Sequence, residues 1–166
     1  MMKKLILTAF FLVGFSIPAV AQNSIKNLYC SDYHGNRVQI IPDSSARLIA
    51  EAAIRTYGVP QIRINPMQLK GISPNARAFA VCHVCANLTL GHLVRAVDNI
   101  YDHYDKVGKA DYSVVAKFFY IGQVNKKAID AIEEEINHMS REQWSHFPGP
   151  IRVVALNGGC ELKPMD

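Results

Sequence analysis

Side chains that can bind a metal ion or exchange disulfides are concentrated in one segment, Ala80–His92. Cys82 and Cys85 form a C-x-x-C pair, and His83 stands between them. A C-x-x-C pair is typical of thiol–disulfide exchange, in which a thiolate attacks a disulfide. Imidazole, in contrast, is the commonest metal ligand among side chains. The segment is therefore the first candidate for a functional site, with either redox or metal chemistry.

The first 21 residues have the three parts of a secretory signal peptide. Lys3 and Lys4 form the positive start, Leu5–Phe15 is an apolar run, and Ala19–Ala21 is a small-x-small cleavage site. The run is too short for an uncleaved membrane anchor, which needs about 20 apolar residues, and Pro18 ends it early. We therefore expect an exported protein, periplasmic or secreted, with no membrane span after cleavage.

The composition predicts one folded domain over residues 22–166. The chain has 166 residues, of which 49% are hydrophobic and 19% charged, so it has enough apolar side chains for a core. A disordered, collagen-like or multi-pass membrane protein is excluded. The net charge is only +4 and no basic block occurs, so nothing indicates a nucleic-acid partner. A protein or peptide partner remains the expectation, and the sequence does not identify it.

An exported chain meets an oxidising compartment, where an even number of cysteines favours disulfides. The four cysteines, Cys30, Cys82, Cys85 and Cys160, allow three pairings, and the sequence does not select one. Cys30 and Cys160 could close a long loop, which leaves the other two as a local bridge or as buried neighbours. A zinc finger is excluded because no second ligand pair follows at short spacing. Haem attachment is excluded because Ala86 stands where histidine is required.

The same segment resembles the active-site helix of gluzincin-type zinc metallopeptidases, which carries H-E-x-x-H followed by x-x-L-G-H. Here His83–Asn87 reads H-V-C-A-N, and Leu88–His92 reads L-T-L-G-H. Downstream, Ala110–Asp111 resembles the A-D pair that follows the third zinc ligand, and Ser145–Arg152 resembles the end of the family's domain. The likeness covers residues 62–160 in order and implies a zincin-like fold with a zinc peptidase site.

The chain departs from this pattern at the residues that carry the chemistry. The family's first zinc ligand matches His83, but its general-base glutamate matches Val84, which takes no proton from a metal-bound water. The second ligand matches Asn87, whose neutral amide is a poor zinc ligand beside imidazole. The third ligand matches Val107, which cannot coordinate. The base and two of the three ligands are therefore missing together.

Other side chains do not rebuild the site. His92 lies nine residues after His83, which places the two imidazoles on opposite sides of one helix. The resemblance places Asp111 and His92 beside the former metal site, as supporting residues rather than ligands. We expect His83 to be a hydrogen-bonded side chain beside Asn87 and expect no cofactor. Zinc is expected only if the interpretation of a degenerate site is wrong.

Apolar spacing, capping residues and turn residues predict an α+β, single-domain, zincin-like fold, mostly helical with a small N-terminal sheet. Trp144, Phe147, Phe118 and Phe119 should pack the helical half, and the run Glu133–Glu135 should be an exposed stretch of helix. The expected elements are a β-hairpin within Leu28–Ile41, a helix over Ala46–Tyr57, an edge strand over Gln61–Asn65, a helix from Pro74 with an apolar stripe reaching Val97, helices over Ala110–Tyr120 and Asn125–Met139, and a strand over Ile151–Leu156.

The joint loss of base and ligands predicts an exported, catalytically inactive metallopeptidase homologue that acts as a binding or structural module. Two alternatives stay open. One is a periplasmic thiol–disulfide oxidoreductase that uses Cys82 and Cys85, although both lie well inside the predicted helix rather than at its N-terminus. The other is a metallopeptidase with an altered metal site. Reduction of insulin would favour the first alternative, and bound zinc would favour the second.

Overall fold

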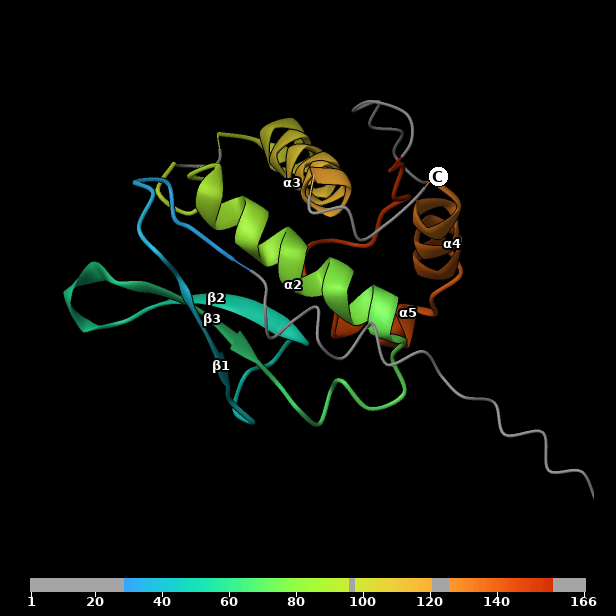
Figure 1. Ribbon diagram of the computed structural model, residues 1–166, viewed down its shortest axis with the longest axis horizontal. Helices are drawn as coiled ribbons and strands as arrows, with labels where there is room; N and C mark the ends of the chain where they lie inside the picture. The colour runs from blue at the N-terminus through green and yellow to red at the C-terminus, as the bar shows by residue number, and fades with distance from the viewer. Residues whose placement is uncertain (1–28, 96–97, 121–125, 157–166) are drawn as a thin grey trace, which may run out of the picture.

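The computed structural model describes residues 29–95, 98–120 and 126–156, without the side chains of 117–120. Within these ranges a three-stranded sheet precedes four α-helices, which agrees with a mixed α and β class (Figure 1). The predicted signal peptide, Val97 and Cys160 lie outside the described residues, as do the side chains of Phe118 and Phe119. The elements are β1 (Gln39–Pro42), β2 (Ala50–Ile54), the 3-10 turn η1 (Thr56–Gly58), β3 (Pro60–Ile64), α2 (Pro74–Thr89), α3 (Ile100–Tyr120), α4 (Lys126–Asn137) and α5 (Arg141–Ser145).

Helix α2 is the central element, because it lies between the sheet and the other helices (Figure 1). On one side, Val81 and Val84 pack with Ile62 of β3 in a first apolar cluster. On the other side, Phe79 packs with Phe147 in a second cluster that α3 and α4 complete. Ten of the sixteen residues of α2 are buried, as expected for a helix that is covered on most of its circumference.

The start of α2 is as predicted, but its end comes earlier. Ser73 caps the helix by accepting a hydrogen bond from the Ala76 N–H at 3.1 Å, and Pro74 occupies the first turn, where its missing N–H costs nothing. The helix ends at Thr89, and Gly91 follows with φ +70°. The predicted apolar stripe therefore stops before Leu93, which is 47% exposed.

The predicted helix over Ala46–Tyr57 is wrong, because residues 50–54 form strand β2. Just before the predicted helix, the side chain of Asp43 accepts from the N–H and hydroxyl of Ser45 and closes a turn. The Asn65 side-chain amide donates to the Ala46 carbonyl at 2.6 Å, which holds the chain before β2 against the end of β3. Antiparallel pairing with β3, the next strand along the chain, thus overrides the local helix preference of this alanine-rich stretch.

Strand β3 confirms the predicted strand but lies in the centre of the sheet rather than at its edge. The order is β1-β3-β2, with β1 parallel and β2 antiparallel to β3. The predicted N-terminal hairpin is reduced to one bridge, between Ser31 and Arg37 around Gly35, because β1 pairs with β3 instead. Because β2 lies between β1 and β3 in the sequence, local residue spacing does not predict that β1 pairs with β3.

Helix α3 begins ten residues before the predicted start at Ala110. Its first half is largely polar, although Val107 is buried, and polar contacts support it. The Asn99 side chain accepts from the Asp102 N–H at 3.0 Å, and Asp102 pairs with Lys106 one turn on. The predicted helix over Asn125–Met139 is confirmed as α4, with Ile132 among its buried residues.

No strand forms over Ile151–Leu156 in the described part of the chain, contrary to the prediction. The Asn137 side chain takes the place of a partner strand, because it donates to the Val154 carbonyl at 2.9 Å and accepts from the Val154 N–H at 2.8 Å. Glu133 accepts from the Leu156 N–H at 2.6 Å. Glu135 accepts from the Ser73 hydroxyl at 2.6 Å, so the acidic run of α4 is not a purely solvated stretch.

Candidate functional site

His83 is buried at the contact between α2 and α3. It is 1% exposed, and its Nδ1 lies 2.6 Å from Oδ1 of Asp111, which is 5% exposed. An ionised carboxylate only accepts hydrogen bonds, so Nδ1 carries the proton and donates it. His83 is therefore hydrogen bonded, and its partner is Asp111 of α3.

Arg152 completes a buried charged cluster with these two residues. Its Nε donates to Asp111 Oδ2 at 2.7 Å and its Nη2 donates to Oδ1 at 2.8 Å, which makes a two-pronged ion pair. Its Nη1 donates to the carbonyls of Pro148 and Pro150 at 3.3 and 2.9 Å. The guanidinium carbon lies 5.2 Å from the centre of the Trp144 ring. Arg152 therefore joins the last described segment to α3 and α5.

The electrostatics of the cluster favour a neutral histidine. Burial lowers the pKa of His83, and the bond to Asp111 only partly opposes that shift. Burial alone would raise the pKa of Asp111, but the hydrogen bonds from Arg152 and His83 outweigh it and hold that pKa below its usual value. The ionised carboxylate and the guanidinium cancel, so the cluster carries no net charge when His83 is neutral.

The turn at Gly149 approaches this cluster closely. Gly149 has φ +85°, and a Cβ atom there would lie 2.9 Å from Nη1 of Arg152 and 3.6 Å from Nε2 of His83. Nε2 is the nitrogen that remains after Nδ1 binds Asp111. A side chain at this position would therefore press on the cluster, which explains a glycine between two prolines.

The other positions that match the family's site have surroundings different from those of His83. Val84 is 4% exposed in the apolar cluster under the sheet, and Val107 is 5% exposed on α3. Asn87 is half-buried, and its side-chain oxygen accepts from Nδ1 of His92 at 2.8 Å. His92 lies beyond the end of α2, past the break at Gly91. Burial lowers the pKa of His92, and the nearby lysines of α3 add to the effect.

These donors do not fit a zinc ion. Of the three matched ligand positions only His83 carries a good ligand, and both oxygens of Asp111 are taken by hydrogen bonds from His83 and Arg152. Among the described residues no group of three or more histidine, cysteine, aspartate or glutamate side chains is placed to hold a metal.

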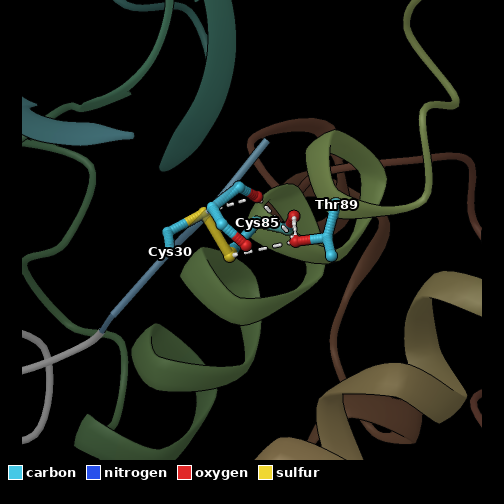
Figure 2. The surroundings of a disulfide bond; sticks show 4 residues. Cys30, Cys85 and Thr89 are labelled. Atoms are coloured by element: carbon cyan, nitrogen blue, oxygen red, sulfur yellow. Dashed lines mark hydrogen bonds between the residues drawn. A yellow bond between two sulfur atoms is a disulfide. The ribbon is translucent and has the colours of Figure 1, made fainter. Parts of the chain in front are cut away.

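The structure pairs Cys30 with Cys85, not with Cys160 as the long-loop pairing expected. The bridge joins the segment before β1 to Cys85, in the last part of α2, with a Cα–Cα distance of 5.7 Å (Figure 2). Cys82 is 2% exposed and packs in the other apolar cluster, toward α3 and α4. The C-x-x-C pair therefore does not form a local bridge.

Sequence reasoning missed two interactions of the site. Arg152 is 41 residues from Asp111 in sequence, and no spacing rule connects them. The contact between His92 and Asn87 depends on the turn at Gly91, which brings the chain back over the last turn of α2. A glycine four residues after a half-buried asparagine is too weak a signal to predict this contact.

Comparisons of the chain with protein-family models, with curated proteins and with solved structures gave no match. Across the residues that the structure describes, no helix has the length and apolar character needed to cross a membrane.

Proposed function

We propose that this protein is an exported, catalytically inactive homologue of zinc metallopeptidases that acts as a binding or structural module. The surroundings of Val84, which matches the catalytic glutamate in the resemblance, carry the proposal. Val84 packs with Val81 and Ile62 in the apolar cluster between α2 and the sheet. A valine takes no proton from water, and apolar surroundings disfavour any charged base at this point.

The ligand positions support the same proposal. Val107 has no donor atom, and the Asn87 oxygen is used by His92. His83 is held by Asp111 and Arg152 in a neutral cluster that is stable without a metal charge. Under this proposal, His83 and the residues that hold it stabilise the fold rather than support catalysis.

Metal analysis and peptidase assays of the purified mature protein test the proposal. We expect less than stoichiometric zinc after equilibration with zinc and desalting, and no casein hydrolysis that a chelator abolishes. His83→Gln serves as a variant that keeps a hydrogen-bonding side chain, and it should leave metal content unchanged. One zinc per chain, together with hydrolysis that is lost on chelation and in His83→Gln, would overturn the proposal and favour an altered metal site.

The thiol–disulfide oxidoreductase has less support. Cys85 is bonded to Cys30, and Cys82 is buried within the core rather than exposed at a helix N-terminus. Insulin reduction that depends on Cys82 would restore this alternative.

A further inference from the structure

The segment before β1 is fastened to the C-terminal end of α2. The Cys30–Cys85 disulfide is the covalent link. One turn later, the Thr89 hydroxyl lies 2.7 Å from the Ser31 carbonyl oxygen and 3.0 Å from the Cys85 carbonyl oxygen, and these two acceptors share its single proton (Figure 2). The backbone that follows Ser31 is therefore held in a fixed position over the end of the helix.

Tyr33 lies on this fastened segment and packs against the turn after α2. A Cβ atom at Gly91 would lie 2.8 Å from its ring, so only glycine permits the contact. The Arg95 guanidinium lies 5.6 Å from the ring centre, and the His34 ring packs edge-on at 5.3 Å. Despite these contacts Tyr33 remains 50% exposed. The aromatic ring is thus presented to solvent in one orientation.

Two exposed apolar residues belong to the same turn. Leu93 is 47% exposed and Val94 is 67% exposed, and in sequence both lie between Gly91 and Arg95, the two residues of the turn that approach the Tyr33 ring. We refer to Tyr33, His34, Leu93, Val94 and Arg95 as the Tyr33 patch. Its composition, with an anchored tyrosine beside arginine and aliphatic groups, is that of the energetic centre of protein interfaces.

The accessible charges on the two segments that form the patch are positive. Beside them, Lys106 of α3 donates to the Arg95 carbonyl at 3.4 Å and is paired with Asp102, and Asp98 is exposed three residues after Arg95. Arg95 and Arg37 are exposed, and the sole carboxylate within residues 29–37 and 91–95 is that of Asp32. Asp32 is only 9% exposed, and it accepts hydrogen bonds from the His34 N–H and from two groups of Asn36 at 2.8–3.1 Å. That carboxylate is directed into its own loop, so the accessible charges of the patch are positive.

We propose that the Tyr33 patch binds an acidic segment of a partner protein that also carries apolar side chains. Carboxylates of the partner would pair with Arg95 and Arg37, and an apolar side chain would pack on the Tyr33 ring. The fastening of the loop before binding reduces the entropy lost on association. This inference gives the proposed binding module its surface, but it uses none of the matched catalytic positions.

Fluorescence anisotropy with a short labelled peptide of glutamate, leucine and serine tests the inference, with a lysine-for-glutamate peptide as the comparison. We expect the acidic peptide alone to bind, and Tyr33→Ala and Arg95→Glu each to weaken binding by about tenfold or more. Val94→Ser, at a side chain that is 67% exposed, should weaken binding without affecting folding.

The turn between β2 and β3 supplies matched controls. Tyr57 is 97% exposed and Arg55 is exposed beside it, so Tyr57→Ala and Arg55→Glu change the same residue types elsewhere on the surface. Both should leave the affinity within about twofold of the unsubstituted protein. The inference is overturned if the acidic peptide does not bind, if these controls weaken binding as much as the patch variants do, or if vesicles of phosphatidylserine compete for the patch more strongly than the peptide. Zinc-dependent hydrolysis would overturn the proposed function but not this surface.

Discussion

The neutral cluster of His83, Asp111 and Arg152 is the main polar feature of the core. A buried ion pair contributes little net stability when it is intact, but the loss of one partner leaves an uncompensated buried charge. Here the arginine uses all its nitrogen atoms, two on Asp111 and one on the turn carbonyls, so its hydrogen-bonding groups are fully engaged. Its role in this account is to fix the contact between α2, α3 and the chain after α5.

Replacement of Asp111 by asparagine should therefore be costly. The substitution keeps the size of the side chain but leaves the buried Arg152 charge unpaired, which costs about 3–5 kcal/mol of the free energy of unfolding. Asp130→Asn, which removes the exposed pair with Lys126, is the matched control and should cost at most about 1 kcal/mol. Urea unfolding at neutral pH measures both, and equal costs would show that the cluster does not stabilise the fold.

The buried histidine predicts how stability depends on pH. The pKa of His83 is lowered in the folded state, so the unfolded chain binds a proton first as the pH falls below about 6.5. Stability should decrease from about pH 7 to pH 5, with a slope from this group of at most about 1.4 kcal/mol per pH unit. Asp111 has a lowered pKa and is ionised in both states over this range, so its contribution is lost only at lower pH.

Urea unfolding across this pH range measures the slope, and His83→Gln isolates the contribution of His83. The slope should decrease in this variant, while His92, whose pKa is also lowered, maintains part of it. An unchanged slope in His83→Gln would show that His83 is not buried in its neutral form.

Tyr57 is the one described non-glycine residue with a positive φ, at +70°. The left-handed conformation is strained for a bulky side chain and is adopted more easily by asparagine. Tyr57→Asn should raise the free energy of unfolding by about 0.5–1 kcal/mol, because the ring is 97% exposed and contributes little packing. Tyr101→Asn, at an 81% exposed position in α3, should give no gain. Equal effects of the two substitutions would contradict the strain at Tyr57.

At the scale of the elements, local signals predicted the parts of the fold that local contacts stabilise. The start of α2 follows from Ser73 and Pro74, which act within one turn. Strand β2 could not be predicted, because its alanine-rich sequence favours a helix and its strand form depends on β3 and on the Asn65 bond to Ala46. Apolar and polar residues alternate over residues 151–156 as in a strand. The Val154 backbone, however, bonds the side chain of Asn137 instead of a neighbouring strand.

The disulfide between Cys30 and Cys85 links two parts of the fold, and its contribution to stability can be predicted. Its cysteines are 55 residues apart, and loop closure of this length corresponds to about 4 kcal/mol in the chain-entropy account. The double variant Cys30→Ser/Cys85→Ser should lose stability of this order, measured by urea unfolding. Peptide mapping without reduction should recover Cys30 and Cys85 in one linked pair. A Cys30–Cys160 or Cys82–Cys85 pair in the native protein would show that this pairing is wrong.

For the whole molecule, the sequence indicated which residues could not do zinc chemistry but not what they do instead. Val84 and Val107 lack the necessary groups in any fold. That His83 would be bonded to Asp111 and closed in by Arg152 depends on how two helices and the last described segment pack, which residue types alone do not determine. The zincin-like assignment is still a prediction from the resemblance.

We propose that α2 and α3 retain the framework of a metal site that has lost its ligands. Asn87 lies one helical turn after His83 on α2, and Val107 lies one turn before Asp111 on α3. Because His83 and Asp111 are in contact, both turns flank the same helix–helix contact. Asn87→His would complete a pair of imidazoles at i and i+4, and Val107→Glu would add a carboxylate ligand.

The zinc affinity of the double variant Asn87→His/Val107→Glu is the most direct test. It can be measured by competition with a chromogenic chelator, on protein whose circular dichroism matches that of the unsubstituted chain. We predict one zinc per chain, bound far more tightly than by the unsubstituted protein, with little gain in either single variant because two of three ligands hold the ion weakly. A folded double variant that binds zinc no better than the unsubstituted protein would contradict the register of His83, Asn87 and Val107, and with it the proposed descent from a zinc peptidase.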